Sequence, residues 1–105
     1  PDKFDIRFYN GSYDLSLNAQ LYLNEVVGLL FRNPQVRALC SGHAGVLEES
    51  EGNLDLSKAR AKAVRDYILE SGLPPERVVM NFFGEEHAEN NGSIDRRVIV
   101  TFFAD

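Results

Sequence analysis

Strand-like and helix-like patterns alternate along the chain, and this order restricts the folds available to it. Residues 4–8 alternate apolar and polar side chains, which is typical of a half-buried strand. Residues 16–33 repeat apolar side chains at helical spacing, with Ser16 as the expected N-cap and Pro34 beyond the end. Because helices separate the early strands, we expect crossover connections and some parallel pairing.

The later segments complete the pattern. Residues 36–41 are predicted to form a second strand, residues 56–71 a second helix that ends at Gly72, and residues 78–83 and 97–103 two further strands. We therefore predict an α/β fold, an α+β two-layer sandwich of order βαβαββ. Two helices would pack on one face of a mixed four-stranded sheet. The last two strands are expected to pair as neighbours.

Composition and charge exclude several classes of function. The 105 residues are 44% hydrophobic and 26% charged, which is typical of one globular domain. A net charge of -5 argues against nucleic-acid binding. No stretch approaches the roughly 20 apolar residues of a membrane helix. We expect neither nucleic acid as a partner nor insertion of this domain into a membrane.

Side chains that serve catalysis or bind metals are too sparse to form a recognisable centre. Cys40 is the single cysteine, so a disulfide framework and a multi-cysteine metal site are excluded. Alternation in its strand points Cys40 toward the core, where an inert thiol is expected. His43 and His87 lack the spacing of metal ligands. We predict a protein that is not an enzyme and has no metal and no cofactor.

One charged residue breaks the pattern of the second helix. Arg60 falls inside the apolar stripe, whereas the other basic residues of this helix lie on its far side: Lys58, Lys62 and Arg65. A buried guanidinium without a partner costs several kcal/mol. Two interpretations follow from the periodicity alone. Either Arg60 reaches solvent or meets a structural carboxylate, or it presents its fork to the carboxylate of a ligand.

Four motifs accompany these elements and point to a known family. Gly42-His43-Ala44-Gly45 follows the second strand, and the motif Asn-x-x-Leu-Ser-x-x-Arg-Ala-x-x-Val runs from Asn53 to Val64 into the second helix. Gly84-Glu85 follows the third strand, and Asp95-Arg96-Arg97-Val98 opens the last. Over nearly the whole chain these segments resemble the C-terminal domain of outer membrane protein A. That OmpA-like family includes the Pal lipoproteins and the flagellar motor protein MotB.

The resemblance implies a location, a partner and a set of site residues. The family binds peptidoglycan non-covalently in the periplasm through the diaminopimelate of the stem peptide, without enzymatic activity. Its helix arginine, matched by Arg60, takes the ligand carboxylate. The match assigns Asn53 and Arg96 to the lining of the same pocket, and Leu56 and Ser57 to the helix start beside it.

The resemblance also suggests a longer protein. The chain begins at a proline without a methionine, so we expect residues 1–105 to be a single OmpA-like domain excised from a longer envelope protein. A part outside this chain would then tether the domain to the outer or the inner membrane.

The ligand turn departs from the family pattern. The family has threonine and aspartate where this chain has Ala44 and Gly45, and glycine where it has Glu48. The missing aspartate takes the ligand's ammonium in the family, and a hydrogen bond to a charged group contributes roughly 1.5–3 kcal/mol. We expect recognition of diaminopimelate to be weakened or lost, unless Glu48, Glu49 or Glu51 reaches in. Without the aspartate, the pocket around Arg60 is expected to be more positive than in relatives.

An alternative function follows from the same departure. The domain would be a periplasmic scaffold or protein-interaction module that keeps only the fold. Its partners would then be other envelope proteins in place of peptidoglycan.

Overall fold

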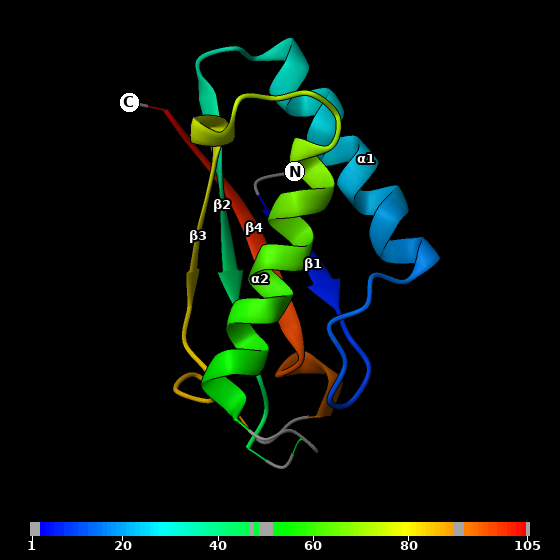
Figure 1. The fold of residues 1–105 in the computed structure, drawn as a ribbon, viewed down its shortest axis with the longest axis vertical. Helices are drawn as coiled ribbons and strands as arrows, with labels where there is room; N and C mark the ends of the chain where they lie inside the picture. The colour runs from blue at the N-terminus through cyan, green and yellow to red at the C-terminus, as the bar shows by residue number, and fades with distance from the viewer. Residues whose placement is uncertain (1–2, 47, 49–51, 90–91, 105) are drawn as a thin grey trace.

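Two helices cover one face of a four-stranded sheet (Figure 1). The computed structural model describes residues 3–46, 48, 52–89 and 92–104. Its elements, in chain order, are β1 (Lys3–Arg7), α1 (Leu17–Arg32), β2 (Val36–Gly42), α2 (Asn53–Leu69), β3 (Val78–Phe82) and β4 (Arg97–Ala104). Short 3-10 helices at Pro75–Arg77 and Gly92–Ile94 precede the last two strands. The predicted element order and the two-layer α/β architecture are confirmed.

The sheet has the order β1-β4-β2-β3. β4 runs antiparallel to both of its neighbours, and β2 and β3 run parallel. The expectation that the last two strands pair was therefore wrong. Val100 of β4 lies opposite Phe4 of β1 and Cys40 of β2, and all three side chains are buried. β4 and β2 thus take the two inner positions of the sheet.

The core lies between the sheet and the helices. Its fully buried side chains come from all four strands and from both helices: Ile6, Leu23, Val26, Leu30, Ala38, Cys40, Val64, Ile68, Val78, Val98 and Val100. Ser16 caps α1 as predicted, because its Oγ accepts a hydrogen bond from the Ala19 N–H at 3.1 Å. Two neighbouring residues of this helix, Leu21 and Tyr22, are more than half exposed.

The second helix begins earlier than predicted. Gly52 is its N-cap and its carbonyl accepts from the Leu56 N–H at 2.9 Å, so the first turn starts at Asn53. A glycine cap has no side-chain oxygen, so the sequence offers no polar side chain at the N-cap position to mark this start. Because α2 starts at the end of the sheet where β2 finishes, the motif after β2 and the first turns of α2 face one another.

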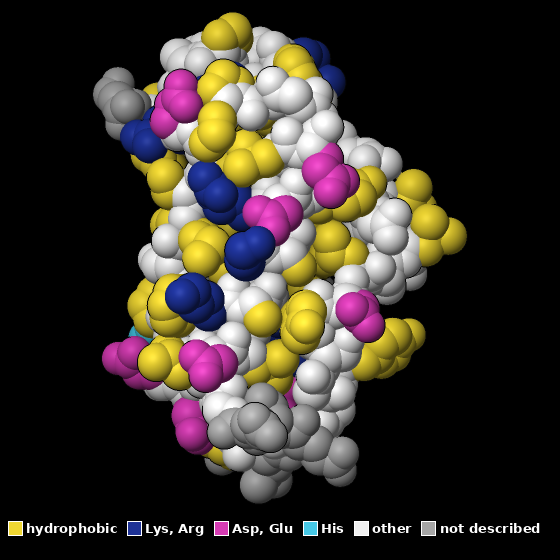
Figure 2. Space-filling view, viewed as in Figure 1, with side chains coloured by type: hydrophobic (Ala, Val, Ile, Leu, Met, Phe, Trp, Pro, Cys, Tyr) yellow, Lys and Arg dark blue, Asp and Glu magenta, His cyan; other side chains and the backbone are white. Residues whose placement is uncertain are grey.

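The outward-facing side chains of α2 are mostly charged, whereas many beside α1 are apolar. Figure 2 shows Lys and Arg side chains among acidic ones over α2, and apolar side chains projecting beside α1. Within the described residues, no helix combines the length and the hydropathy that crossing a bilayer requires. The same residues contain no group of three or more His, Cys, Asp or Glu side chains that could hold a metal ion.

Cys40 is fully buried in β2. Burial raises the pKa of its thiol to about 12, although the charge of Arg65 acts in the opposite direction. The thiol therefore stays protonated at neutral pH. The predicted inert core cysteine is confirmed.

A substitution at Gly42 tests the close contact between the end of β2 and α2. A Cβ at this position would stand 2.0 Å from the Ser57 carbonyl oxygen. Gly42→Ala should therefore lower the free energy of unfolding by about 3 kcal/mol or more, measured by urea denaturation. Gly28→Ala is the matched control, since its Cβ would meet only the flexible end of Arg32. That control should raise the free energy of unfolding by about 0.5–1 kcal/mol, and equal effects of the two changes would contradict this account.

Candidate functional site

Arg60 is the largest fully buried side chain that the structure describes. Its Nε donates to the Ser12 carbonyl at 2.8 Å, and its Nη2 to the Tyr9 carbonyl at 3.2 Å. Its Nη1 donates to the His43 carbonyl at 3.0 Å and to Oε2 of Glu48 at 2.7 Å. A second bond from Nη2 reaches Oε1 of Glu48. A guanidinium has five N–H groups, and all five of them are used here.

Glu48 is the counter-charge of this arginine. Its side chain is 3% exposed. Oε1 accepts from Arg60 and from the Gly11 N–H at 3.0 Å, and Oε2 accepts from Arg60 and from the Gly45 N–H at 2.7 Å. Two donors on each oxygen fill the roughly four acceptor positions of a carboxylate. The two side chains therefore form a bidentate ion pair with every hydrogen-bonding position occupied.

Of the two interpretations of Arg60, the structure agrees with the first, because Arg60 meets a structural carboxylate, that of Glu48. The expectation of a more positive pocket was wrong, because Glu48 lies against the guanidinium and cancels its charge. Of the three acids considered as replacements for the turn aspartate, Glu48 reaches Arg60, whereas Glu49 and Glu51 lie outside the described residues.

The surroundings of Glu48 keep it ionised. Burial alone would raise the pKa of its carboxyl. The hydrogen bonds from Arg60, Gly45 and Gly11, together with the charge of Arg60, outweigh burial and hold the pKa below its ordinary value. Phe8 adds a ring 5.3 Å from the guanidinium carbon of Arg60. At neutral pH both members of the pair are therefore charged.

A turn after β1 supplies three of the contacts to this pair. The Ser12 N–H donates to the Tyr9 carbonyl at 3.0 Å and closes the turn. Gly11, with φ of 67°, occupies a conformation that other residues rarely adopt, and its N–H points to Glu48. The carbonyls of Tyr9 and Ser12 point to Arg60. The role of this turn cannot be read from the sequence, because backbone groups carry no residue signature.

The turn after β2 lies on the other side of Glu48. Ala44 is buried and its N–H donates to the Gly84 carbonyl at 2.8 Å. A Cβ on Gly45 would stand 3.3 Å from Cβ of Asp95 and 3.8 Å from its Oδ2. Asp95 is buried and its Oδ1 accepts from the Glu89 N–H at 2.8 Å. The position of the missing turn aspartate is thus bordered by two other acids, Glu48 and Asp95.

A small pocket of about 130 Å³ opens beside this turn. It is lined by Asn10, Gly45, Val46, Glu48, Gly92, Asp95 and Arg96. Of the residues assigned to ligand binding by resemblance, Arg96 alone is among these lining residues. The pocket therefore lies between the turn after β2, which lacks the family aspartate, and the Asp95-Arg96 motif before β4.

The other assigned residues secure the start of α2. Ser57 is buried, and its Oγ donates to the Leu54 carbonyl at 2.7 Å and accepts from the Gly84 N–H at 2.8 Å. Leu56 is buried beside it. Asn53 lies seven residues before Arg60, ~10 Å away along the helix axis, and its Nδ2 donates to Glu85 at 3.4 Å. These contacts connect the helix to the turn after β3.

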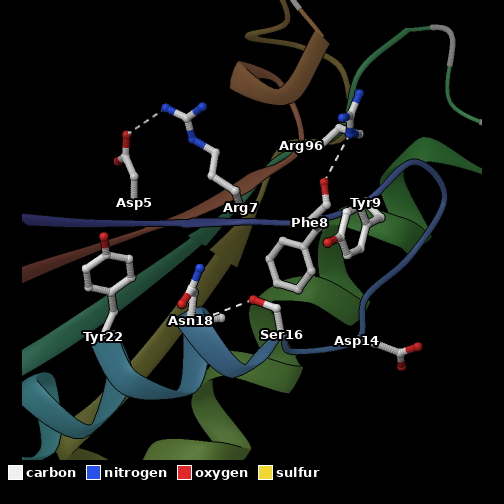
Figure 3. Close-up of a pocket in the computed structure, with 10 residues that line it drawn as sticks. Asp5, Arg7, Phe8, Tyr9, Asp14, Ser16, Asn18, Tyr22 and Arg96 are labelled. Carbon is white, nitrogen blue, oxygen red and sulfur yellow. Dashed lines mark hydrogen bonds and ion pairs between the residues drawn. The ribbon is translucent and has the colours of Figure 1, made fainter.

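Arg96 also lines a larger groove of about 300 Å³ between β1 and the start of α1 (Figure 3). Its Nε donates to the Phe8 carbonyl at 3.0 Å, and the Phe8 ring points from β1 toward α1. Tyr22 and Asn18 border the groove from the helix side. Arg96 thus lines both the groove and the small pocket.

Comparisons with known proteins agree on one family. The sequence model of the OmpA family matches residues 7–98. The peptidoglycan-associated lipoprotein of Rhizobium meliloti (strain 1021) is 32% identical over 81 residues, which are 77% of this chain and 46% of that protein. The chain therefore spans about half the length of this curated relative.

Solved structures resemble the fold closely. The peptidoglycan-associated lipoprotein from Burkholderia pseudomallei matches with a TM-score of 0.84 and 26% identity, over 94% of this chain and 89% of that chain. The C-terminal domain of Helicobacter pylori MotB matches with a TM-score of 0.83, over 97% and 85% of the two chains. Its 19% identity supports the fold alone.

Replacing Glu48 by its neutral isostere tests the ion pair. Because the pKa of Glu48 is lowered on folding, its contribution to stability is present above about pH 4.5 and is lost as the pH falls through the lowered value. Glu48→Gln should reduce the free energy of unfolding at pH 7 by about 3 kcal/mol. It should also remove part of the loss of stability that wild type shows below about pH 4.5.

The control for this change is Glu86→Gln, because Glu86 is exposed. It should alter the free energy of unfolding by no more than about 0.5 kcal/mol. If urea denaturation gave Glu48→Gln the stability of wild type at pH 7, the pair would have no structural role.

Proposed function

Because the chain belongs to the OmpA family, we propose that it is a periplasmic domain of the cell envelope in which recognition of diaminopimelate-type peptidoglycan is weakened or lost. Family membership itself makes it a non-enzymatic domain, related to proteins that associate with peptidoglycan. A tether to the outer or inner membrane, through a part outside this chain, belongs to the proposal. The chain spans 46% of its lipoprotein relative, which leaves room for such a part.

The saturated pair of Arg60 and Glu48 is the observation that carries this proposal. A ligand carboxylate could bind Arg60 only by displacing Glu48 and breaking its four hydrogen bonds. Hydrogen bonds to charged groups contribute roughly 1.5–3 kcal/mol each. A ligand would regain only the donors that Glu48 releases, so little net affinity would come from the arginine.

The ammonium of a diaminopimelate ligand also meets a changed environment. Gly45 offers no carboxylate where the family has one. Asp95 and Glu48 stand next to Gly45, but Asp95 is engaged with the Glu89 N–H and Glu48 with Arg60. Recognition of a zwitterion needs an anion and a cation that are both free to face it. Arg60 and the two acids beside Gly45 are all engaged within the protein, which supports weakened binding.

Sedimentation with purified sacculi tests the proposed function. Wild type should stay in the supernatant. Gly45→Asp combined with Glu48→Gly, which places the family residues at both positions, should increase binding by roughly tenfold or more. Gly45→Asp alone should not, because Glu48 still occupies Arg60 and the new carboxylate would crowd Asp95.

The same sedimentation experiment can also contradict the proposal. If wild type sediments with sacculi, and a folded Arg60→Ala variant remains in solution, then the wild-type site binds peptidoglycan and the proposal is wrong. Circular dichroism of each variant is the control for folding.

A second candidate function, a protein-interaction module, is favoured by the surface around α1. Six apolar side chains of α1 and the segment before it are each more than half exposed: Tyr9, Tyr13, Leu17, Leu21, Tyr22 and Phe31. Figure 2 shows apolar side chains projecting along this side of the molecule. Exposed apolar groups gathered on one side are typical of surfaces that bind proteins.

Site-specific cross-linking in the periplasm tests the second candidate. A photoreactive residue at position 21 should cross-link to another envelope protein. The same group at Lys62, on the charged outer face of α2, is the control and should give no such product. Equal labelling from both positions would contradict a specific interaction surface.

A further inference from the structure

We infer that Glu48 is an intramolecular ligand: it occupies a preformed carboxylate site that the rest of the chain builds around Arg60. The inference rests on the proposed function, because it names the group that keeps the family site closed. It goes further by assigning the site a ligand class, a small monocarboxylate, once Glu48 is removed. Three observations carry it.

The first observation is that backbone contacts hold the arginine in place in addition to Glu48. Three of its five N–H groups donate to backbone carbonyls, those of Ser12, His43 and Tyr9. The Phe8 ring lies against the same guanidinium. These contacts fix the plane of the guanidinium, and the two remaining N–H groups point to the Glu48 carboxylate. A site held in this way stays preorganised when its occupant leaves.

The second observation is that two backbone donors complete the site. The Gly11 N–H comes from the turn after β1 and the Gly45 N–H from the turn after β2. Together with Arg60 they place four donors around two oxygen atoms, two on each. Four donors in this arrangement match a carboxylate, and a bidentate guanidinium adds the planar geometry that a carboxylate requires.

The third observation is the space that removal of Glu48 would create. Truncation at Cβ removes a CH₂–COO⁻ group, and acetate is that same group with one added hydrogen. The pocket of about 130 Å³ is lined by Glu48 and Gly45, so it gives a path from solvent to the vacated site. Without Glu48, the buried guanidinium would lack its carboxylate partner, which favours uptake of a single negative charge.

Chemical rescue of Glu48→Ala by acetate tests the inference. Thermal unfolding is followed in sodium acetate at neutral pH, with sodium chloride of equal ionic strength as the reference. At acetate concentrations about tenfold above its Kd, the Tm of Glu48→Ala should rise by roughly 5–10 °C. Wild type and Glu86→Ala, whose glutamate is exposed, should rise by no more than about 1 °C.

The double variant Glu48→Ala, Arg60→Met shows whether rescue uses the assigned site. It keeps the vacated space but lacks the guanidinium, so acetate should leave its Tm unchanged. If Glu48→Ala is unfolded in chloride, the expected result becomes refolding that depends on acetate and is absent from the double variant. Failure of acetate to stabilise or refold Glu48→Ala would overturn the inference in either case.

A measurement on the folded wild type gives a second test. The Arg60 Nε–H resonance in a ¹⁵N NMR spectrum should not respond to acetate while Glu48 is present. A saturable shift in wild type would show that external carboxylates displace Glu48, and the inference would be wrong. Sedimentation of wild type with sacculi would overturn the proposed function but not the acetate rescue, so the two failures are distinguishable.

Discussion

Five hydrogen bonds from one buried guanidinium join segments that are distant in the sequence. Arg60 on α2 binds the turn after β1 through Tyr9 and Ser12, and the turn after β2 through His43. It binds the loop before α2 through Glu48. An unpaired charge at this depth would cost several kcal/mol, so the arrangement depends on the carboxylate of Glu48. The packing of both turns against the first half of α2 is therefore coupled to a single ion pair.

The same pair changes what the family site can do. Relative to the family pattern, an acid is absent at Gly45 and another is present at Glu48, three residues later. An acid at position 45 would border the small pocket, where a ligand ammonium can reach it. The acid at position 48 instead accepts hydrogen bonds from Arg60 and from two backbone N–H groups. The number of charges near the arginine is similar, but the partner of the acid has changed from a ligand to the protein itself.

Local patterns predicted the helices, the layers and the need for a partner at Arg60, because hydrophobic periodicity is a property of neighbouring residues. The pairing of β4 with β1 and β2 was not predicted, since it depends on contacts between distant segments. The partner of Arg60 was not assigned either. Three of its acceptors are backbone carbonyls, which have no residue signature, and Glu48 was one of several acids in a polar loop.

The central claim is that Glu48 closes the Arg60 site of the folded protein to outside ligands. The most direct measurement is a ¹⁵N NMR titration of wild type with meso-diaminopimelate that follows the amide resonances of Gly11 and Gly45, the two backbone donors to Glu48. We predict that neither resonance of wild type moves at millimolar ligand. In a Gly45→Asp, Glu48→Gly double variant, the amide resonances at positions 11 and 45 should both shift. Saturable shifts of these amides in wild type would contradict the central claim.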